Sequence, residues 1–304
     1  MIYTLTLNPA IDYFLAFDSF VEGNLNTPRE TYKLPGGKGI NVSKILKNFS
    51  TDSICLGFIG GFTGDFIKST LENDGLETKF FNVKEDTRIN IKINNNGLES
   101  EIAGTSPSIS KENLDELFYF LKNNLKSGDI LALSGSVPAS IPTSIYADII
   151  DAIPKDVKVI LDTRGLPFEI ALKKGVFLIK PNQDEINEFF HSNFSTNEEL
   201  IEAGKKLQTM GAENVLISLG AKGSIFITKN EIFISGVPKG NLISSNGSGD
   251  SMIGGFIYGL NKNLSLDKCY ELGIASGSAT AFSKGLATFE TMENLLKEIK
   301  INKL

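Results

Sequence analysis

The strongest constraint on the fold is a repeated pattern in the later part of the chain, where short apolar runs alternate with amphipathic segments. The apolar runs have the length of strands and lie at residues 129–133, 157–161, 176–179 and 214–219. The segments at 114–125 and 145–150 carry apolar residues at helical spacing. Strands that are apolar on both faces are covered on both sides, and parallel strands need a crossover that is usually a helix. The pattern therefore predicts an α/β fold with a doubly wound, mainly parallel sheet and helices on both faces.

The beginning of the chain has a different pattern of apolar and polar residues. A first buried strand at residues 2–7 is followed by strand-like segments at 12–17 and 31–34, with no helix between them. Residues 88–93 alternate between isoleucine and polar side chains and turn at Asn94–Gly97 into a return strand. These segments predict a small antiparallel β lid inserted in the N-terminal half of the chain.

We expect one domain over residues 1–304, with the lid formed by about 12–35 and 86–103. The polar face of the lid would look into a cleft. Because its other face is apolar, we expect a second copy of the chain to cover it, which predicts a homodimer.

Charge and hydropathy exclude several partners. The net charge of −6 and the pI near 5.1 provide no basic surface for nucleic acid. No apolar run reaches the roughly 18 residues that a membrane span needs, and the first residues lack the charged start of a signal peptide. The expectation is a cytoplasmic protein that binds neither nucleic acid nor membrane.

A glycine turn at Asn246–Ser251 leads into apolar residues at helical spacing. The first N–H groups of a helix lack intrahelical partners and attract anions. Asp250 lies in this first turn, where a carboxylate could take a proton from a hydroxyl while the amides hold a phosphoryl group. An ordinary helix-terminal carboxylate in a tight turn is the competing interpretation.

Other nucleotide-binding patterns are absent. The chain has no GxxxxGK[ST] loop and no H-R-D triplet, and Met252 stands where GxGxxG needs its third glycine, which argues against an NAD-dependent dehydrogenase. Polar residues instead follow several of the predicted strands: Asn8, Asp12, Ser134, Ser136, Asp162, Lys180, Asn182, Glu185 and Ser218. In open parallel sheets the ligand binds beyond the carboxyl ends of the strands, so these residues predict one rim.

Two motifs carry a resemblance to a known family. Gly36-Gly37-Lys38-Gly39-Ile40-Asn41-Val42-Ser43 and Gly247-Ser248-Gly249-Asp250-Ser251-Met252 resemble the two signatures of the ribokinase-like (PfkB) carbohydrate kinases. The resemblance extends over essentially the whole chain. It implies transfer of the γ-phosphoryl group of ATP, with Mg²⁺, to the C6 hydroxyl of fructose 1-phosphate. Tagatose 6-phosphate and fructose 6-phosphate remain alternative acceptors, and a non-catalytic sensor on the same fold is a further alternative.

The resemblance also implies roles for individual residues. Asp250 would be the catalytic base, with the amides of Gly247, Ser248 and Gly249 as the anion hole. The phosphosugar would be bound by Asp12, Gly37, Lys38, Asn41, Arg88, Asn90 and Ser136, with Lys38 and Arg88 on its phosphate. The nucleotide would be bound by Lys180, Asn182, Ser218, Gly220, Gly223 and Ser278. Glu185 and Asn182 would organise Mg²⁺, largely through water.

Three positions depart from the family pattern. Ser248 replaces the usual alanine of the anion hole, and we expect activity to survive because the amide is the functional group. Asn246 stands at a commonly apolar place, which leaves any monovalent-cation effect open. The turn that contains Arg164 lacks the usual serine, so its contacts are open as well.

Overall fold

The computed structural model describes residues 1–304, which form two sheets and ten α-helices. The larger sheet has ten strands in the order β14-β13-β12-β11-β10-β9-β8-β1-β4-β5. These strands are β1 (Ile2–Thr6), β4 (Ile54–Ile59), β5 (Glu77–Asn82), β8 (Ile130–Ser134), β9 (Lys158–Asp162), β10 (Val176–Ile179), β11 (Ala212–Ser218), β12 (Ser224–Ile227), β13 (Ile232–Ser235) and β14 (Ile301–Lys303). All pairs from β11 to β5 are parallel, and β12, β13 and β14 add antiparallel neighbours at one edge.

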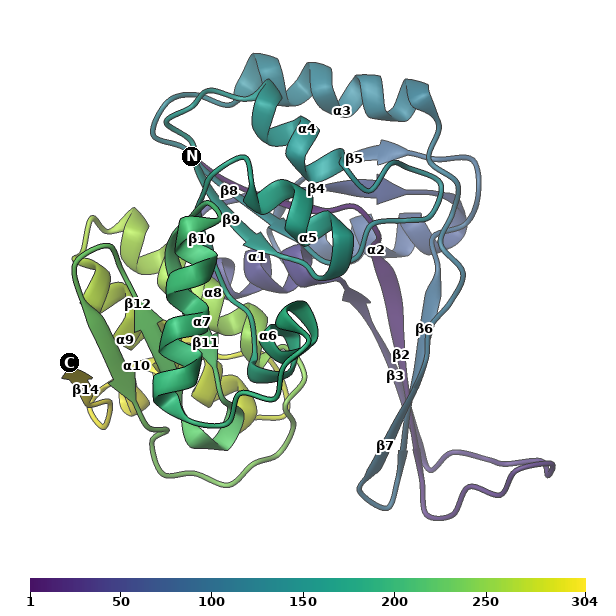
Figure 1. Ribbon diagram of the computed structural model, residues 1–304. Coiled ribbons are helices and arrows are strands. Elements are labelled where there is room, and N and C mark those ends of the chain that lie inside the picture. Colours follow the sequence, from purple (N-terminus) through teal and green to yellow (C-terminus); the bar gives the residue numbers. More distant parts are fainter.

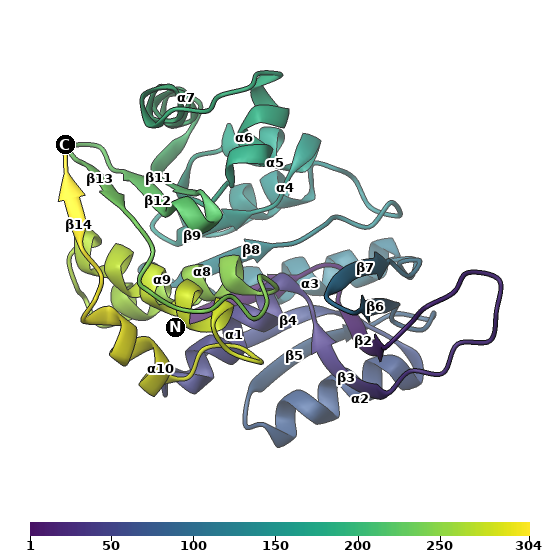
Figure 2. The same ribbon diagram turned by 90° about the horizontal axis from the view of Figure 1, so that it is seen from below.

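Helices cover both faces of this sheet, as the alternating pattern predicts (Figures 1 and 2). One face carries α3 (Lys111–Asn124), α4 (Ile145–Ala152), α5 (Gly165–Leu172), α6 (Gln183–Phe190) and α7 (Asn197–Thr209). The other face carries α1 (Lys38–Asn48), α2 (Gly61–Asn73), α8 (Ser248–Asn261), α9 (Leu266–Ala281) and α10 (Phe289–Leu296). No helix is both long enough and apolar enough to cross a membrane.

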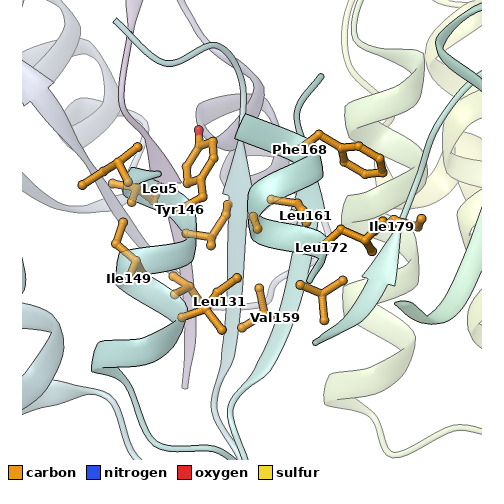
Figure 3. Packing of buried hydrophobic residues seen from close by; sticks show 14 of the residues in the cluster. Leu5, Leu131, Tyr146, Ile149, Val159, Leu161, Phe168, Leu172 and Ile179 are labelled. Carbon is orange, nitrogen blue, oxygen red and sulfur yellow. The ribbon is translucent and has the colours of Figure 1, made fainter. Parts of the chain in front are cut away.

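The main core lies between the sheet and the first of these helical layers. Figure 3 shows side chains of β1, β8, β9 and β10 meeting those of α4 and α5. Tyr146 of α4 is fully buried there, and its hydroxyl donates to the main-chain oxygens of Ser134 and Gly135 at 3.2 Å each. This contact ties the core to the carboxyl end of β8, next to the rim that the sequence predicts.

The smaller sheet is the expected lid. It has the order β3-β2-β6-β7, with β2 (Ala10–Phe17), β3 (Glu30–Gly36), β6 (Ile89–Asn95) and β7 (Leu98–Ile102). The outer pairs β2–β3 and β6–β7 are antiparallel hairpins, while the central pair β2–β6 is parallel. Figure 1 shows the lid reaching away from the body.

Three elements of the structure were not expected from the sequence pattern. They are helix α5 and strands β5 and β14. Helix α5 starts at Gly165 and has Pro167 in its first turn, where a missing N–H costs nothing.

Candidate active site

Three polar side chains lie in one row at the carboxyl edge of the large sheet. Thr6 of β1 is the register partner of Ser134 of β8, and Ser134 is the register partner of Asp162 of β9. All three are buried. Register partners in a parallel sheet point to the same side, and the contact of Thr6 with the start of α1 shows that this side is the one covered by α1 and α8. Two of the residues predicted at the rim, Ser134 and Asp162, therefore lie side by side at this edge.

Helix α8 begins at this edge. Its N-cap, Gly247, has φ 76°, and a Cβ there would come within 2.8 Å of the Leu286 side chain. A glycine is therefore required both by the left-handed backbone and by the close packing. Asp250 follows in the first turn and is only 7% exposed. The predicted glycine turn thus places a buried carboxylate in the first turn of a helix, where the Ser248 N–H donates to the Ser245 main-chain oxygen at 3.2 Å.

A second helix N-terminus meets the first. Helix α1 begins after Gly37, whose φ is 133°, and a Cβ there would lie 2.7 Å from the Thr6 side chain. Asn41, one turn into α1, donates from Nδ2 to Asp250 Oδ2 at 2.8 Å. The two glycine-rich motifs, more than 200 residues apart in the chain, therefore meet at one carboxylate.

The charge around Asp250 is mixed. Burial, assisted by the negative charge of Asp162, raises the pKa of Asp250 to about 6, although Asn41, Lys38 and Lys180 act in the opposite direction. A carboxylate with a pKa near 6 is ionised at neutral pH and is a stronger base than an exposed one. The arrangement can accept a proton from a hydroxyl.

Asp162 is the residue whose importance the sequence did not reveal. Its Oδ2 lies 3.1 Å from Lys38 Nζ, and its Oδ1 lies 3.8 Å from Lys180 Nζ. Burial opposes ionisation, but Lys180 and Lys38 hold the pKa of Asp162 below its usual value. The sequence indicated Asp162 only as one of many polar residues after a strand. Lys38, expected on the sugar phosphate, and Lys180, expected on the nucleotide, share this carboxylate.

The lid supplies a second group of polar side chains. Asn90 of β6 donates from Nδ2 to Asp12 Oδ1 at 2.9 Å across the parallel pair β2–β6. Arg88, half buried, donates from Nη2 to the main-chain oxygen of Asn8 at 3.0 Å and has no ion-pair partner. Asn8 also donates from Nδ2 to Ser136 Oγ at 3.2 Å. A half-buried guanidinium without a carboxylate partner is suited to binding an anion.

Asn8 connects to one further residue that the sequence analysis did not include. Its Nδ2 also donates to Ser106 Oγ at 2.8 Å. Ser106 follows the return strand of the lid, and no spacing in the sequence associates it with the first strand.

The residues expected at the nucleotide are spread along the same edge. Asn182 and Glu185 form a capping box at the start of α6: Asn182 Oδ1 accepts from the Glu185 N–H at 2.7 Å, and Glu185 Oε2 accepts from the Asn182 N–H at 2.9 Å. The Ser218 N–H donates to the main-chain oxygen of Pro181 at 3.0 Å, which aligns the ends of β10 and β11. The structure therefore gives the spacing of Asn182 and Glu185 a local structural role in addition to any role with metal.

The two glycines after β11 differ in what requires them. Gly223 has φ 101°, and a Cβ there would clash with the Ser235 main-chain oxygen, so both its backbone conformation and the packing demand glycine. Gly220, with φ 57°, has open space around it. Ser278 is buried in α9 and forms no hydrogen bond with Ser218 or with either glycine.

A cavity of about 500 Å³ opens beside Asp162, between α5 and α6. Charged side chains, among them Lys180 and Glu185, line the cavity together with apolar side chains such as Phe168 and Phe189. The buried ion pairs of the site therefore lie next to a space that can hold a ligand group.

Comparison with known proteins agrees with this geometry. The sequence pattern described as "pfkB family carbohydrate kinase" matches residues 5–292. The chain is 44% identical to 1-phosphofructokinase of Bacillus subtilis (strain 168), with 100% of both chains covered. It is 34% identical to D-tagatose-1-phosphate kinase of Bacillus licheniformis, again over 100% of both. The crystal structure of phosphofructokinase-2 from Escherichia coli in complex with fructose-6-phosphate superimposes with a TM-score of 0.90 at 25% identity, covering 97% of this chain and 98% of that one.

Proposed function

The chain belongs to the pfkB family of carbohydrate kinases, and from that premise we propose that it transfers the γ-phosphoryl group of ATP to the C6 hydroxyl of fructose 1-phosphate. The observation that carries the proposal is the buried Asp250 at the N-terminus of α8, hydrogen-bonded by Asn41 and flanked by the charges of Lys38 and Lys180. It combines a base with a cationic, amide-rich anion site, which are the two requirements of phosphoryl transfer.

In the proposed reaction, Asp250 takes the proton of the C6 hydroxyl as the oxygen attacks the γ-phosphorus. The new O–P bond forms while the bond to the β-phosphate oxygen breaks, and ADP leaves with that electron pair. The N–H groups of Gly247 and Gly249 and the ammonium of Lys180 would neutralise the charge that spreads over the phosphoryl oxygens. The Ser248 N–H would join them by exchanging its present acceptor, the Ser245 main-chain oxygen, for a phosphoryl oxygen. A Cβ on Gly249 would lie 2.9 Å from Lys180 Nζ, so these donors already lie close to one another.

The sugar would be held between α1 and the lid. Asp12, Asn90 and Asn41, together with the backbone at Gly37, would bind its hydroxyl groups. Arg88, which has no ion-pair partner, and Ser136 would bind the 1-phosphate. Lys38 Nζ lies 3.1 Å from Asp162 Oδ2 and is also subject to the charge of Asp250, so we assign it to the transferring group.

The ATP site would extend along the carboxyl ends of β10 and β11, past Ser218, Gly220 and Gly223, towards Ser278 of α9. Mg²⁺ is part of the proposal. Glu185 keeps Oε1 without a protein hydrogen-bond partner, and Asn182 is exposed to water. Two oxygen-bearing side chains in contact with water suit an ion that keeps much of its hydration and takes other ligands from phosphate. When bound, Mg²⁺ would neutralise the nucleotide phosphates.

We further propose a homodimer formed through the lid, in an enzyme that works in the cytoplasm. The face of the lid opposite Asp12 and Asn90 carries Ile91 and its cross-strand partner Ile102, and Ile102 and Leu98 are 55% and 69% exposed. A second copy of the chain would cover this apolar face with the same surface.

The test is an ADP-release assay on a panel of phosphosugars: fructose 1-phosphate, tagatose 1-phosphate, tagatose 6-phosphate and fructose 6-phosphate. Tagatose 1-phosphate is included because a relative at 34% identity is named for it. We expect the highest kcat/KM with fructose 1-phosphate and a product that carries the new phosphate on C6. ADP release that is independent of every sugar would contradict the proposal, and a preference for another member of the panel would correct the substrate.

A further inference from the structure

Asp162 is an acidic side chain in a place where a charge is expensive. It is the last residue of β9 and is 4% exposed, and its main-chain oxygen accepts from the Gly135 N–H at 2.9 Å. A buried ion pair is weak evidence for stability, because the loss of hydration offsets much of the attraction. The presence of such a group beside the reacting residues suggests that it serves the reaction.

Its two partners come from opposite sides of the site. Lys38 begins α1, on the side of the sugar, and its Nζ lies 3.1 Å from Asp162 Oδ2. Lys180 follows β10, on the side of the nucleotide, and its Nζ lies 3.8 Å from Asp162 Oδ1. One carboxylate therefore holds two ammonium groups that would otherwise repel each other.

The lysines need such an anchor. A lysine ammonium is a point charge on a flexible four-carbon chain, whereas phosphoryl transfer depends on donors that are in place before the charge develops. The Lys180 side chain is 7% exposed, and that of Lys38 is 39% exposed. Without Asp162, the more exposed Lys38 could turn to water, and both ammonium groups could pair directly with Asp250.

We propose that Asp162 is a positioning residue of the kinase reaction, which holds Lys38 and Lys180 on either side of the transferring phosphoryl group and keeps them from neutralising Asp250. This inference rests on the proposed function. It assigns Asp162 no contact with the substrate.

The charges around Asp250 give the proposal a distinct signature. Asp162, Lys38 and Lys180 are the charged groups that act on Asp250, and Asn41 is its hydrogen-bond donor. Asp162 assists burial in raising the pKa of Asp250, whereas the lysines lower it. Removing the Asp162 charge would eliminate the repulsion and free the lysines, so both effects would lower the pKa of Asp250.

The experiment compares the kcat/KM pH profiles of wild type, Asp162→Asn and Asp162→Glu with the preferred phosphosugar. For Asp162→Asn we expect kcat to fall by roughly 100-fold, the KM for ATP to rise, and the acidic limb of the profile to move to lower pH. Asp162→Glu keeps the charge but displaces the lysines, so kcat should fall while the acidic limb stays close to its wild-type position.

Asp129→Asn is the matched control. Asp129 is also a buried carboxylate with an ion pair, which it forms with the N-terminal ammonium at 2.7 Å. It directly precedes β8 and so lies at the amino ends of the strands, away from the site. This variant should lose stability and keep the wild-type profile. If Asp162→Asn or Asp162→Glu folds with wild-type kcat and an unmoved acidic limb, the positioning role is wrong. A wild-type enzyme inactive on every phosphosugar would refute the proposed function and this inference together.

Discussion

Replacing Asp250 by asparagine should make the protein more stable at neutral pH. Burial raises the pKa of Asp250 from 3.8 to about 6, so the folded protein holds a charge at neutral pH that the unfolded chain holds more easily. Each pKa unit corresponds to about 1.4 kcal/mol, and the shift therefore costs about 3 kcal/mol. Asparagine has nearly the same shape as aspartate. Its side-chain oxygen can still accept from Asn41, whose Nδ2 lies 2.8 Å from Asp250 Oδ2 in the wild type.

The sign of this effect depends on pH. Between about pH 4 and pH 6, Asp250 binds a proton in the folded state but not in the unfolded state. Binding of that proton stabilises the folded wild type below the interval, and this stabilisation is lost as pH rises through it. Above the interval, the free energy of unfolding of the wild type is lowered by the full cost of burying the Asp250 charge. The free energy of unfolding of Asp250→Asn minus that of wild type should therefore be about 3 kcal/mol larger at pH 8 than at pH 3.5.

Urea unfolding and thermal unfolding at both pH values measure this difference. At roughly 2 °C per kcal/mol, the relative gain in Tm at pH 8 should be about 6 °C. Asp129→Asn, which breaks the ion pair with the N-terminal ammonium, should lose stability at pH 8 instead. A stability difference between Asp250→Asn and wild type that is the same at both pH values would refute the claim that the ionised, buried Asp250 destabilises the folded protein.

Three further predictions follow from the site and the lid. Arg88→Lys keeps the charge but loses the planar fork that reaches the Asn8 oxygen, so KM for the phosphosugar should rise about tenfold with little change in kcat; an unchanged KM would remove Arg88 from the phosphate site. Glu185→Gln can still cap α6, so its Tm should stay near wild type while the Mg²⁺ concentration for half-maximal activity rises roughly tenfold; unchanged Mg²⁺ dependence would leave Glu185 with its capping role only. Ile102→Asp places a charge on the exposed apolar face of the lid, so light scattering should find a monomer where the wild type is a dimer, and a dimer that persists would place the interface elsewhere.

The regular part of the fold could be predicted because each signal is local. The apolar runs identify the parallel strands other than β5, whose residues Glu77–Asn82 are mostly polar. The capping box formed by Thr196 identifies the start of α7. The glycine motifs identify the starts of α1 and α8, because the left-handed φ values of Gly37 and Gly247 allow little else. Helix α5 was missed because the sequence from Gly165 to Pro167 is typical of a turn. Strand β14 was missed because three residues at a sheet edge depend entirely on the partner strand β13.

The charged centre of the site could be predicted only in part. Asp250 and Asn41 belong to recognisable motifs, but their hydrogen bond joins residues from two distant motifs. The ion pairs of Asp162 with Lys38 and Lys180 likewise join three separate segments. The residue spacing within one segment does not indicate which side chains of other segments it will contact. The sheet register that places Asp162 beside Ser134 forms only when the chain folds. The assignment of Lys38 to the sugar phosphate stays a prediction, but its pairing with Asp162 favours the transferring group.

The turnover number of Asp250→Asn with fructose 1-phosphate, at saturating ATP and neutral pH, tests the central claim most directly. If the Asp250 carboxylate takes the proton of the C6 hydroxyl, kcat should fall by roughly 100-fold to 10,000-fold, while KM for the sugar changes by no more than about twofold. A folded variant that turns over at a rate within a few-fold of wild type would show that the proton goes elsewhere.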